Sequence, residues 1–452
     1  MKNTEYILKS KRVILDGEVQ EVALRIKNGK IEEIITSEEK WKASANNLPF
    51  QDLENAVVMA GLIDSHVHIN EPGRTEWEGF NTATKSAAAG GITTLVDMPL
   101  NATPVTVNAK DFEIKLQATK GKLHVNCGFW GGIVPENQQD LPELITKGIL
   151  GIKAFLTHSG IDDFPNVTEN DLHKSMALFA KNEMPLLVHC ELDAPHEAQK
   201  ILTQNPSNYI AYLNSRPREW EDNAVALMIR LCEKYNCHVH IVHLSSSDSI
   251  AQLQKAKAKG LPITVETCPH YLTLCAEEIP NGNTLFKCAP PIRERENNDQ
   301  LWEALRNGLI DFVVTDHSPA TPQLKRMDDG NLEKAWGGIA SVQFSLPVFW
   351  TEAQKRGFSI SDMQKLMSEN VASVFKIANK GKISKGFDAD LTIWQPEETF
   401  TLTEEIIEHR HKVTPYLGKE LSGKVLQTYV GGTLVYDNGK FPNLGKGEVV
   451  FK

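Results

Sequence analysis

The sequence predicts an α/β protein in which a (β/α)₈ TIM barrel carries a small β-sandwich domain built from both chain ends. Between residues 57 and 380, eight short apolar runs alternate with longer helix-like segments, as in parallel strands linked by helices. Residues 1–56 instead alternate apolar and polar side chains and contain the turn signal Asn28-Gly29, which is typical of short paired strands. Residues 381–452 repeat this strand pattern with glycine-rich turns.

The number of apolar runs favours a closed barrel with insertions, because eight strand–helix repeats occupy a length typical of that fold. An open doubly wound sheet is the alternative, but no GxGxxG motif follows the first run. Neither end segment is long enough for a core of its own, so we expect the two to pack together as one domain. The eight runs are residues 59–69, 93–99, 123–132, 151–155, 185–190, 238–245, 263–271 and 311–319.

Composition narrows the class of protein. The 452 residues suit one large domain plus a smaller one, and 41% hydrophobic with 23% charged residues indicates a folded chain. The net charge of −10 offers no basic surface for nucleic acid or anionic lipid. No apolar run reaches the roughly 18 residues of a membrane span, and no signal peptide is evident. We therefore expect a cytoplasmic protein whose seven cysteines, none in a CxxC pair, are buried free thiols.

Five metal-type side chains stand at the ends of predicted strands, where a barrel of this kind places its catalytic groups. His66 and His68 are two residues apart, so on an extended strand both imidazoles can reach one ion. His189, His243 and Asp316 end later runs, and barrel closure would bring them into the same ring. Histidines packed in the core or exposed are the alternative for the pair alone. Imidazole and carboxylate ligands suit zinc, and also cobalt, nickel, iron or manganese.

Lys153 lies inside the apolar run GIKAF, where an ammonium group is costly to bury. One interpretation is an ion pair with a neighbouring acid. The other is reaction with carbon dioxide to form a carbamate, an anion whose two oxygens can bridge two cations. Burial favours the neutral amine that this reaction needs. The residues by themselves leave both interpretations open.

A set of motifs along nearly the whole chain resembles the cyclic amidohydrolases, which include dihydroorotases, hydantoinases, dihydropyrimidinases and allantoinases. These motifs are GLIDSHVH at 61–68, EPG at 71–73, GGITT at 90–94, GIKAF at 151–155, VHCE at 188–191, CPHY at 268–271, PPIR at 290–293 and TDHS at 315–318. Three further segments resemble the allantoinase subfamily: residues 68–79, 334–339 and 409–416.

The resemblance implies a metal-dependent enzyme that opens a cyclic amide ring with two divalent ions. Zinc is the expected metal, and cobalt, manganese and nickel are the alternatives. It implies His66 and His68 on one ion and His189 and His243 on the other. It also implies that a carboxylated Lys153 bridges the two ions. The same resemblance implies a homotetramer.

The resemblance further implies that Asp316 binds the first metal and acts as the general base that later returns a proton to the leaving nitrogen. We expect the ring to be recognised by backbone groups near Cys288 and near Trp336 and Gly337, with Asn70 close by. Ordinary loop packing is the alternative for Cys288 and Trp336.

Two positions predict a neutral ring. Dihydroorotases usually show HxHxR, whose arginine can pair with a substrate carboxylate, and here that position is Asn70. They also usually show asparagine two places before the Pro-Pro motif, where this chain has Cys288. The allantoinase resemblance implies hydrolysis of allantoin to allantoate, in purine and ureide catabolism, and a neutral ring is consistent with it. The alternatives are a hydantoinase, dihydropyrimidinase or dihydroorotase, or a non-catalytic scaffold, although every ligand position is filled.

Overall fold

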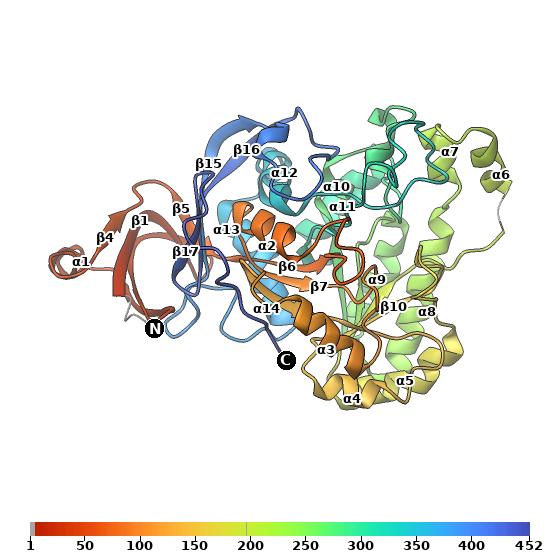
Figure 1. The fold of residues 1–452 in the computed structure, drawn as a ribbon, viewed down its shortest axis with the longest axis horizontal. Coiled ribbons are helices and arrows are strands. Elements are labelled where there is room, and N and C mark those ends of the chain that lie inside the picture. The colour runs from red at the N-terminus through yellow and green to blue at the C-terminus, as the bar shows by residue number, and fades with distance from the viewer. Residues whose placement is uncertain (1–4, 196) are drawn as a thin grey trace.

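The computed structural model describes residues 5–195 and 197–452. Figure 1 shows a sheet built from N-terminal and C-terminal strands beside a larger region of strands surrounded by helices. The larger region holds the predicted site residues, and the sheet packs against it.

The end-built sheet has eight strands, and its red N-terminal strands lie beside its blue C-terminal strands in Figure 1. The order is β17-β16-β15-β5-β1-β2-β3, with β4 paired to β1. β5 joins the two ends, because it pairs antiparallel with β15 and parallel with β1. The bounds are β1 (Glu5–Leu15), β2 (Glu18–Lys27), β3 (Lys30–Ile35), β4 (Phe50–Asp52), β5 (Val57–Ala60), β15 (Leu391–Thr401), β16 (Glu420–Val430) and β17 (Thr433–Asp437).

The hairpin between β2 and β3 turns at the predicted Asn-Gly pair. Asn28 and Gly29 have φ angles of 50° and 81°, the left-handed conformation that a two-residue hairpin turn requires and that these residue types tolerate. Across the sheet, Leu24 of β2 and Leu391 of β15 belong to one buried apolar cluster. The two chain ends therefore share a sheet and a core.

Parallel strands form the larger region, in two sheets with the orders β6-β7-β8 and β14-β13-β12-β11-β10-β9. Every pair of neighbouring strands within them is parallel. Each of the eight predicted apolar runs overlaps at least one of these strands, so the α/β class with parallel strands is confirmed. The bounds are β6 (Leu62–Val67), β7 (Ile92–Asp97), β8 (Asn126–Phe129), β9 (Gly131–Gly132), β10 (Ile152–Phe155), β11 (Leu186–His189), β12 (Val239–Ile241), β13 (Ile263–Thr267) and β14 (Phe312–Val313).

The two parallel sheets adjoin at both edges. Only Trp130 separates β8 from β9, and its backbone N–H donates to the carbonyl of Asp97 in β7 at 3.0 Å. At the other edge, Val67 of β6 forms a parallel bridge with His317, which follows β14. The backbone N–H of His68 donates to the carbonyl of His317 at 2.8 Å. The ends of β6 and of the segment after β14 therefore lie together.

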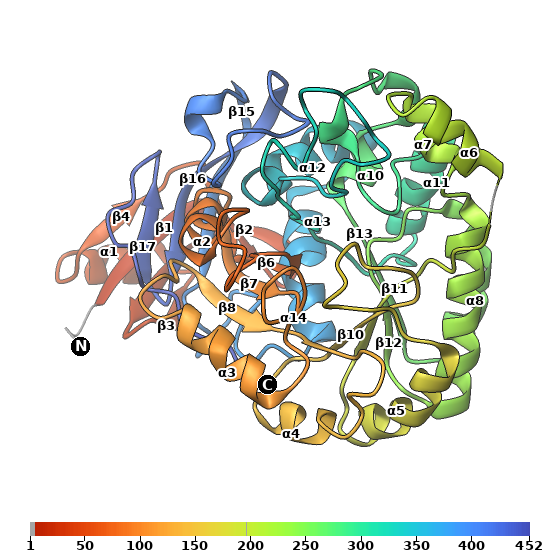
Figure 2. The same ribbon diagram turned by 45° about the vertical axis from the view of Figure 1, so that its right-hand side comes forward.

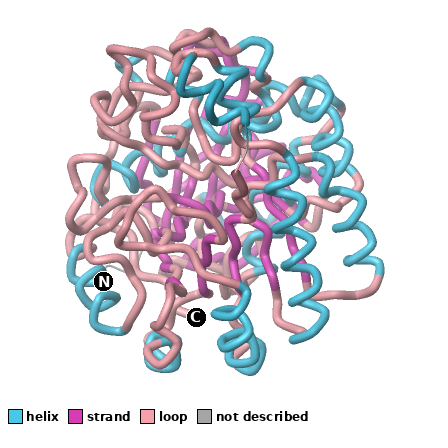
Figure 3. The backbone as a smooth tube through the Cα atoms, turned by 90° about the vertical axis from the view of Figure 1, so that its right-hand side faces the viewer, coloured by secondary structure: helices cyan, strands magenta, loops and turns pink. Residues whose placement is uncertain are grey.

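Helices cover the outside of these strands. Figure 2 shows α3, α4, α5 and α8 along the outer side, and Figure 3 shows strands in the interior with helices at the periphery. The bounds are α1 (Glu38–Ala45), α2 (Phe80–Ala89), α3 (Ala109–Ala118), α4 (Leu141–Thr146), α5 (Glu169–Lys181), α6 (Glu197–Gln204), α7 (Tyr209–Asn214), α8 (Arg218–Tyr235), α9 (Ile250–Ala258), α10 (Pro269–Thr273), α11 (Arg295–Arg306), α12 (Ser345–Ala353), α13 (Ile360–Gln364) and α14 (Asn370–Val374).

Helix α5 illustrates why these segments form helices. Thr168 and Asp171 make a reciprocal capping box at its start, which satisfies backbone N–H groups that the helix leaves free. Leu172, Met176 and Phe179 recur at helical spacing and are buried in the main apolar cluster. Among the helices of the described residues, none is long and apolar enough to cross a membrane.

Candidate metal centre and active site

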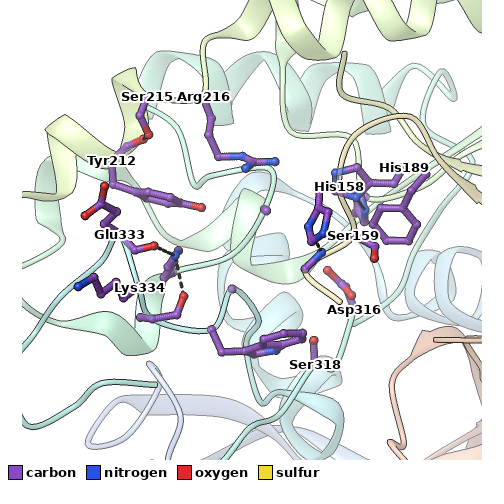
Figure 4. Close-up of a pocket in the computed structure, with 18 of the residues that line it drawn as sticks. His158, Ser159, His189, Tyr212, Ser215, Arg216, Asp316, Ser318, Glu333 and Lys334 are labelled. Atoms are coloured by element: carbon purple, nitrogen blue, oxygen red, sulfur yellow. Dashed lines mark hydrogen bonds between the residues drawn. The ribbon is translucent and has the colours of Figure 1, made fainter. Parts of the chain in front are cut away.

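A cavity of about 750 Å³ opens where the parallel strands end. Figure 4 shows His158, His189 and Asp316 on one side of this cavity and Tyr212 and Arg216 on the other. All six predicted metal ligands line the cavity, although they come from five different strands or strand ends. These six are His66, His68, Lys153, His189, His243 and Asp316.

His66, His68 and Asp316 form the tightest group. One ligand atom from each lies within 4.8 Å of the other two. Oδ1 of Asp316 is 3.3 Å from Nε2 of His66 and 3.4 Å from Nε2 of His68. Two imidazoles and a carboxylate facing one point are a common donor set for a divalent transition metal. Burial lowers the pKa of His66 well below its ordinary value, which favours the neutral ring that ligation needs.

His189 and His243 form a second pair beside the first group. Nδ1 of His189 is 3.0 Å from Nε2 of His243, and the ring of His243 lies 5.3 Å from that of His66, centre to centre. Burial lowers the pKa of both residues. Phe155 stacks on His189 with ring centres 4.6 Å apart and limits how that imidazole can turn. The structure therefore brings all four predicted histidines together.

Lys153 lies on β10, lines the same cavity and is fully buried. Its Nζ has no hydrogen-bond partner among the described residues, and none of their carboxylates lies within ion-pair distance. Burial lowers the pKa of Lys153 to about 8, although Glu266 and Asp316 oppose the shift. Nδ1 of the buried His243 is also without a partner. Such groups are rarely left unsatisfied, so the donor set fits a bound group between them.

Backbone strain accompanies two of these residues. Asp316 has φ 46° and His243 has φ 40°, both in the left-handed region that residues with side chains seldom adopt. Each closely follows a short strand, β14 or β12. Strain of this kind costs on the order of 1–3 kcal/mol and persists where surrounding packing enforces it.

Glu266 on β13 was not singled out from the sequence, yet it contacts several of these side chains. Its Oε1 makes a short hydrogen bond with Nδ1 of His66, and its Oε2 lies 2.9 Å from Nε2 of His240. It also accepts from the backbone N–H of His243. A carboxylate on the far nitrogen of a ligand histidine fixes the ring's orientation. The only signal in the sequence was an acid inside the otherwise apolar run ITVETC.

Glu191 stands in the VHCE motif but was given no role, and Arg216 was missed; together they hold His189. Oε2 of Glu191 lies 2.7 Å from Nε2 of His189, and Arg216 binds the same carboxylate through Nε at 3.0 Å and through Nη2. Burial raises the pKa of Glu191, but Arg216 and His189 outweigh it and lower that pKa to about 2. The carboxylate therefore stays ionised beside the imidazole.

The predicted substrate residues divide into two groups. Trp336 and Gly337 line the cavity, and the indole Nε1 of Trp336 has no partner among the described residues. Asn70 and Cys288 are not among the lining residues. Asn70 donates to the carbonyl of Pro319 at 3.2 Å, and the carbonyl of Cys288 accepts from the Tyr212 hydroxyl at 2.7 Å.

Lys325 ties together the two segments that form this wall of the cavity. Its buried Nζ donates to the carbonyls of Lys287 at 3.2 Å, Trp336 at 3.0 Å and Gly338 at 2.8 Å. The Gly338 N–H also donates to the carbonyl of Lys287 at 2.8 Å. An ammonium has three N–H donors, so these carbonyls saturate it.

Known proteins resemble the chain over nearly its full length. The model of the amidohydrolase family matches residues 57–435. An allantoinase of Streptomyces avermitilis is 46% identical over 441 residues, covering 98% of this chain and 97% of that protein. An allantoinase of Arabidopsis thaliana is 42% identical over 453 residues, covering 97% and 90%.

Among solved structures, an L-hydantoinase (dihydropyrimidinase) from Arthrobacter aurescens has a TM-score of 0.93 and 27% identity. The match covers 99% of this chain and 100% of that one. Fold, side-chain cluster and sequence similarity agree: the chain belongs to the amidohydrolase family, among its allantoinase members.

Proposed function

We propose that this enzyme hydrolyses the cyclic amide bond of allantoin to give allantoate, a reaction of purine and ureide catabolism. The observation that carries the proposal is the 46% identity, over nearly the whole of both chains, with the Streptomyces avermitilis allantoinase. The cluster of His66, His68 and Asp316 supplies the chemistry that the proposal needs.

The enzymes of this family depend on metal. We propose a centre of two divalent ions, with zinc as the expected metal and cobalt, manganese or nickel as alternatives. His66, His68 and Asp316 would hold one ion, and His189 with His243 would hold the other. A carboxylated Lys153 would lie between them, which its burial and its unpaired Nζ support. Bound divalent cations lower the pKa of water towards neutrality and polarise an amide carbonyl.

Asp316 is the proposed general base. Its carboxylate accepts a proton from the attacking water as the new C–O bond forms at the ring carbonyl. The ring C–N bond then breaks, and Asp316 returns the proton to the leaving nitrogen, so the ring opens to a carboxylate and a urea group. Glu266 orients His66 and Glu191 orients His189 during these steps.

The wall formed by Trp336 and Gly337 is the proposed contact surface for the ring, since both residues line the cavity. Asn70 and Cys288 stay predictions as substrate contacts. Asn70 in place of arginine still supports a neutral ring, because an amide does not replace the charged fork that pairs with a carboxylate.

We also propose that the parallel strands close into a (β/α)₈ barrel spanning 57–380, with a β-sandwich domain made from 1–56 and 381–452. The single residue between β8 and β9 and the bridge between Val67 and His317 support closure at the two edges. β5 begins at residue 57 but pairs with β1 and β15, which assigns it to the end-built sheet by pairing. The homotetramer and the cytoplasmic location stay predictions.

A side-by-side assay tests the function. The protein, purified with added zinc, manganese or cobalt, is offered allantoin, hydantoin, dihydrouracil and dihydroorotate, and its metal content per subunit is measured. We expect allantoin to be opened with the highest kcat/KM and about two metal equivalents per subunit. A higher kcat/KM on hydantoin or dihydrouracil would favour the activity named for the Arthrobacter structure, and no turnover of any ring would refute the proposal.

A further inference from the structure

Arg216 has an unused hydrogen-bonding edge inside the cavity. It lies between α7 and α8, lines the cavity, and uses Nε and Nη2 to bind Glu191. Among the described residues, no hydrogen bond or ion pair involves its Nη1. Figure 4 shows the side chain extending from its backbone toward the side where His189 and Asp316 lie.

The guanidinium is held rigidly. The Glu191 carboxylate that fixes it is fully buried, and the Arg216 plane also lies over the Trp220 ring, 5.8 Å from its centre. Since Glu191 binds His189 at the same time, a single carboxylate separates Arg216 from the proposed metal ligand. A donor that is already held in place can orient a bound molecule without a further loss of side-chain entropy.

Two neighbouring polar groups of the cavity wall, Lys287 and Tyr212, are already engaged. Nζ of Lys287 donates to the carbonyls of Ala335 at 2.6 Å and Glu333 at 3.2 Å. The Tyr212 hydroxyl donates to the carbonyl of Cys288. Unlike Lys287 and Tyr212, Arg216 therefore keeps a donor edge for an incoming molecule.

We infer that Nη1 of Arg216 donates to the carbonyl oxygen of the ureido substituent on the ring opened at the His–Asp cluster, which makes Arg216 a specificity residue. This inference rests on the proposed function. A guanidinium is a donor only, so it selects an acceptor such as a urea oxygen. Glu191 neutralises its charge, so the pair suits a neutral acceptor better than a carboxylate. An unsubstituted ring lacks this ureido oxygen.

The test compares Arg216→Lys with wild type on allantoin and on hydantoin, which lacks the ureido arm. Lysine keeps a cation beside Glu191. It lacks the planar guanidinium, which can bind the carboxylate through Nε and Nη2 while Nη1 donates to the substrate. We expect kcat/KM for allantoin to fall about 10- to 100-fold, the usual range for losing a charge-assisted hydrogen bond. For hydantoin, followed as a substrate or as a competitive inhibitor of allantoin opening, we expect a distinctly smaller loss, because that ring lacks the ureido oxygen and is affected only through the hold of Arg216 on Glu191. Metal content per subunit should equal that of wild type.

Arg218→Lys is the matched control, because Arg218 pairs with Asp248 and Glu294 outside the cavity lining, and it should leave both rings unaffected. Equal losses on both rings, or a loss of metal, would mean that Arg216 acts only through His189 and would overturn the inference. Unchanged kinetics would overturn it too. Failure of the wild-type protein to open allantoin would instead refute the proposed function, so the two failures are distinguishable.

Discussion

Asp316 combines a strained backbone with a position between two imidazoles. Asp316 follows the two-residue strand β14 and has a φ of 46°. Its Oδ1 faces Nε2 of both His66 and His68. A carboxylate here can contribute to metal binding and also accept a proton, because it has two oxygens. A single substitution at Asp316 tests whether the carboxylate accepts the proton.

We predict that Asp316→Asn lowers kcat for allantoin about 10²- to 10⁴-fold, because the amide has the same shape but cannot accept the proton. Folding should be retained, as judged by circular dichroism and thermal unfolding. Asp328→Asn, at an exposed position, is the control and should keep wild-type turnover. Turnover by the Asp316 variant within about threefold of wild type would exclude Asp316 as the general base.

Lys153 shows what burial adds to a residue type. The sequence left two interpretations, an ion pair or a carbamate, and no carboxylate of the described residues is close enough for the first. A buried amine with a pKa of about 8 is partly neutral near physiological pH, which is the form that reacts with carbon dioxide. These two observations favour the carbamate, which is the form of Lys153 that we propose.

At the scale of elements, one wall of the cavity consists of two segments that are far apart in sequence, one at Lys287 and one at 336–338. The ammonium group of Lys325 joins them. Lys325 holds the carbonyl of Lys287 next to those of Trp336 and Gly338, and no carboxylate of the described residues pairs with it. Burial lowers the pKa of Lys325 to about 7, and the charge of Lys287 shifts it in the same direction. This junction should make stability depend on pH.

Between pH 7 and about 10.5 the unfolded chain keeps a proton on Lys325 that the folded protein releases. The free energy of unfolding should therefore rise with pH in this window, by at most about 1.4 kcal/mol per unit from this group. We predict that Lys325→Met removes this contribution, so that its unfolding free energy rises less steeply with pH than that of wild type. Denaturant unfolding at several pH values measures it, with Lys110→Met on the exposed side of α3 as control. Equal slopes in all three proteins would contradict the prediction.

At the scale of the whole molecule, the C-terminal segment binds the parallel-strand region directly. Val449 forms a parallel bridge with Cys127 of β8, and the N–H of Val450 donates to the Cys127 carbonyl at 2.9 Å. Because β15 also pairs with β5, the C-terminal region attaches to the rest of the chain at two separate places. Gly447 lies where the segment approaches most closely.

A Cβ at position 447 would lie 2.0 Å from the carbonyl oxygen of Val125, and backbone cannot yield as a flexible side chain does. We predict that Gly447→Ala lowers the free energy of unfolding by about 1–3 kcal/mol, the usual cost of overpacking. Thermal unfolding measures the loss, and allantoin turnover at low temperature should be retained. Lys446→Ala, at the exposed neighbouring position, should unfold like wild type. A wild-type melting temperature for the Gly447 variant would show that this contact is not required.

Local pattern was sufficient for much of this molecule. The alternation of apolar runs and helical segments located all the parallel strands, and the spacing of His66 and His68 indicated a shared ion. Both signals depend on the spacing at which side chains recur on one face of a helix or strand, and a short stretch of chain is enough to show that spacing. The same is true of the turn at Asn28 and Gly29.

Tertiary structure alone decided which side chains support the ligands and which face the cavity. Glu266 reaches His66 across 200 residues of sequence, and Arg216 reaches Glu191 across 25. Asn70 lies two residues after His68, yet its side chain packs against Pro319 instead of lining the cavity. These outcomes depend on how strands and loops pack against one another. Period predicts the side of a strand on which a residue lies, but only packing determines the group that it meets there.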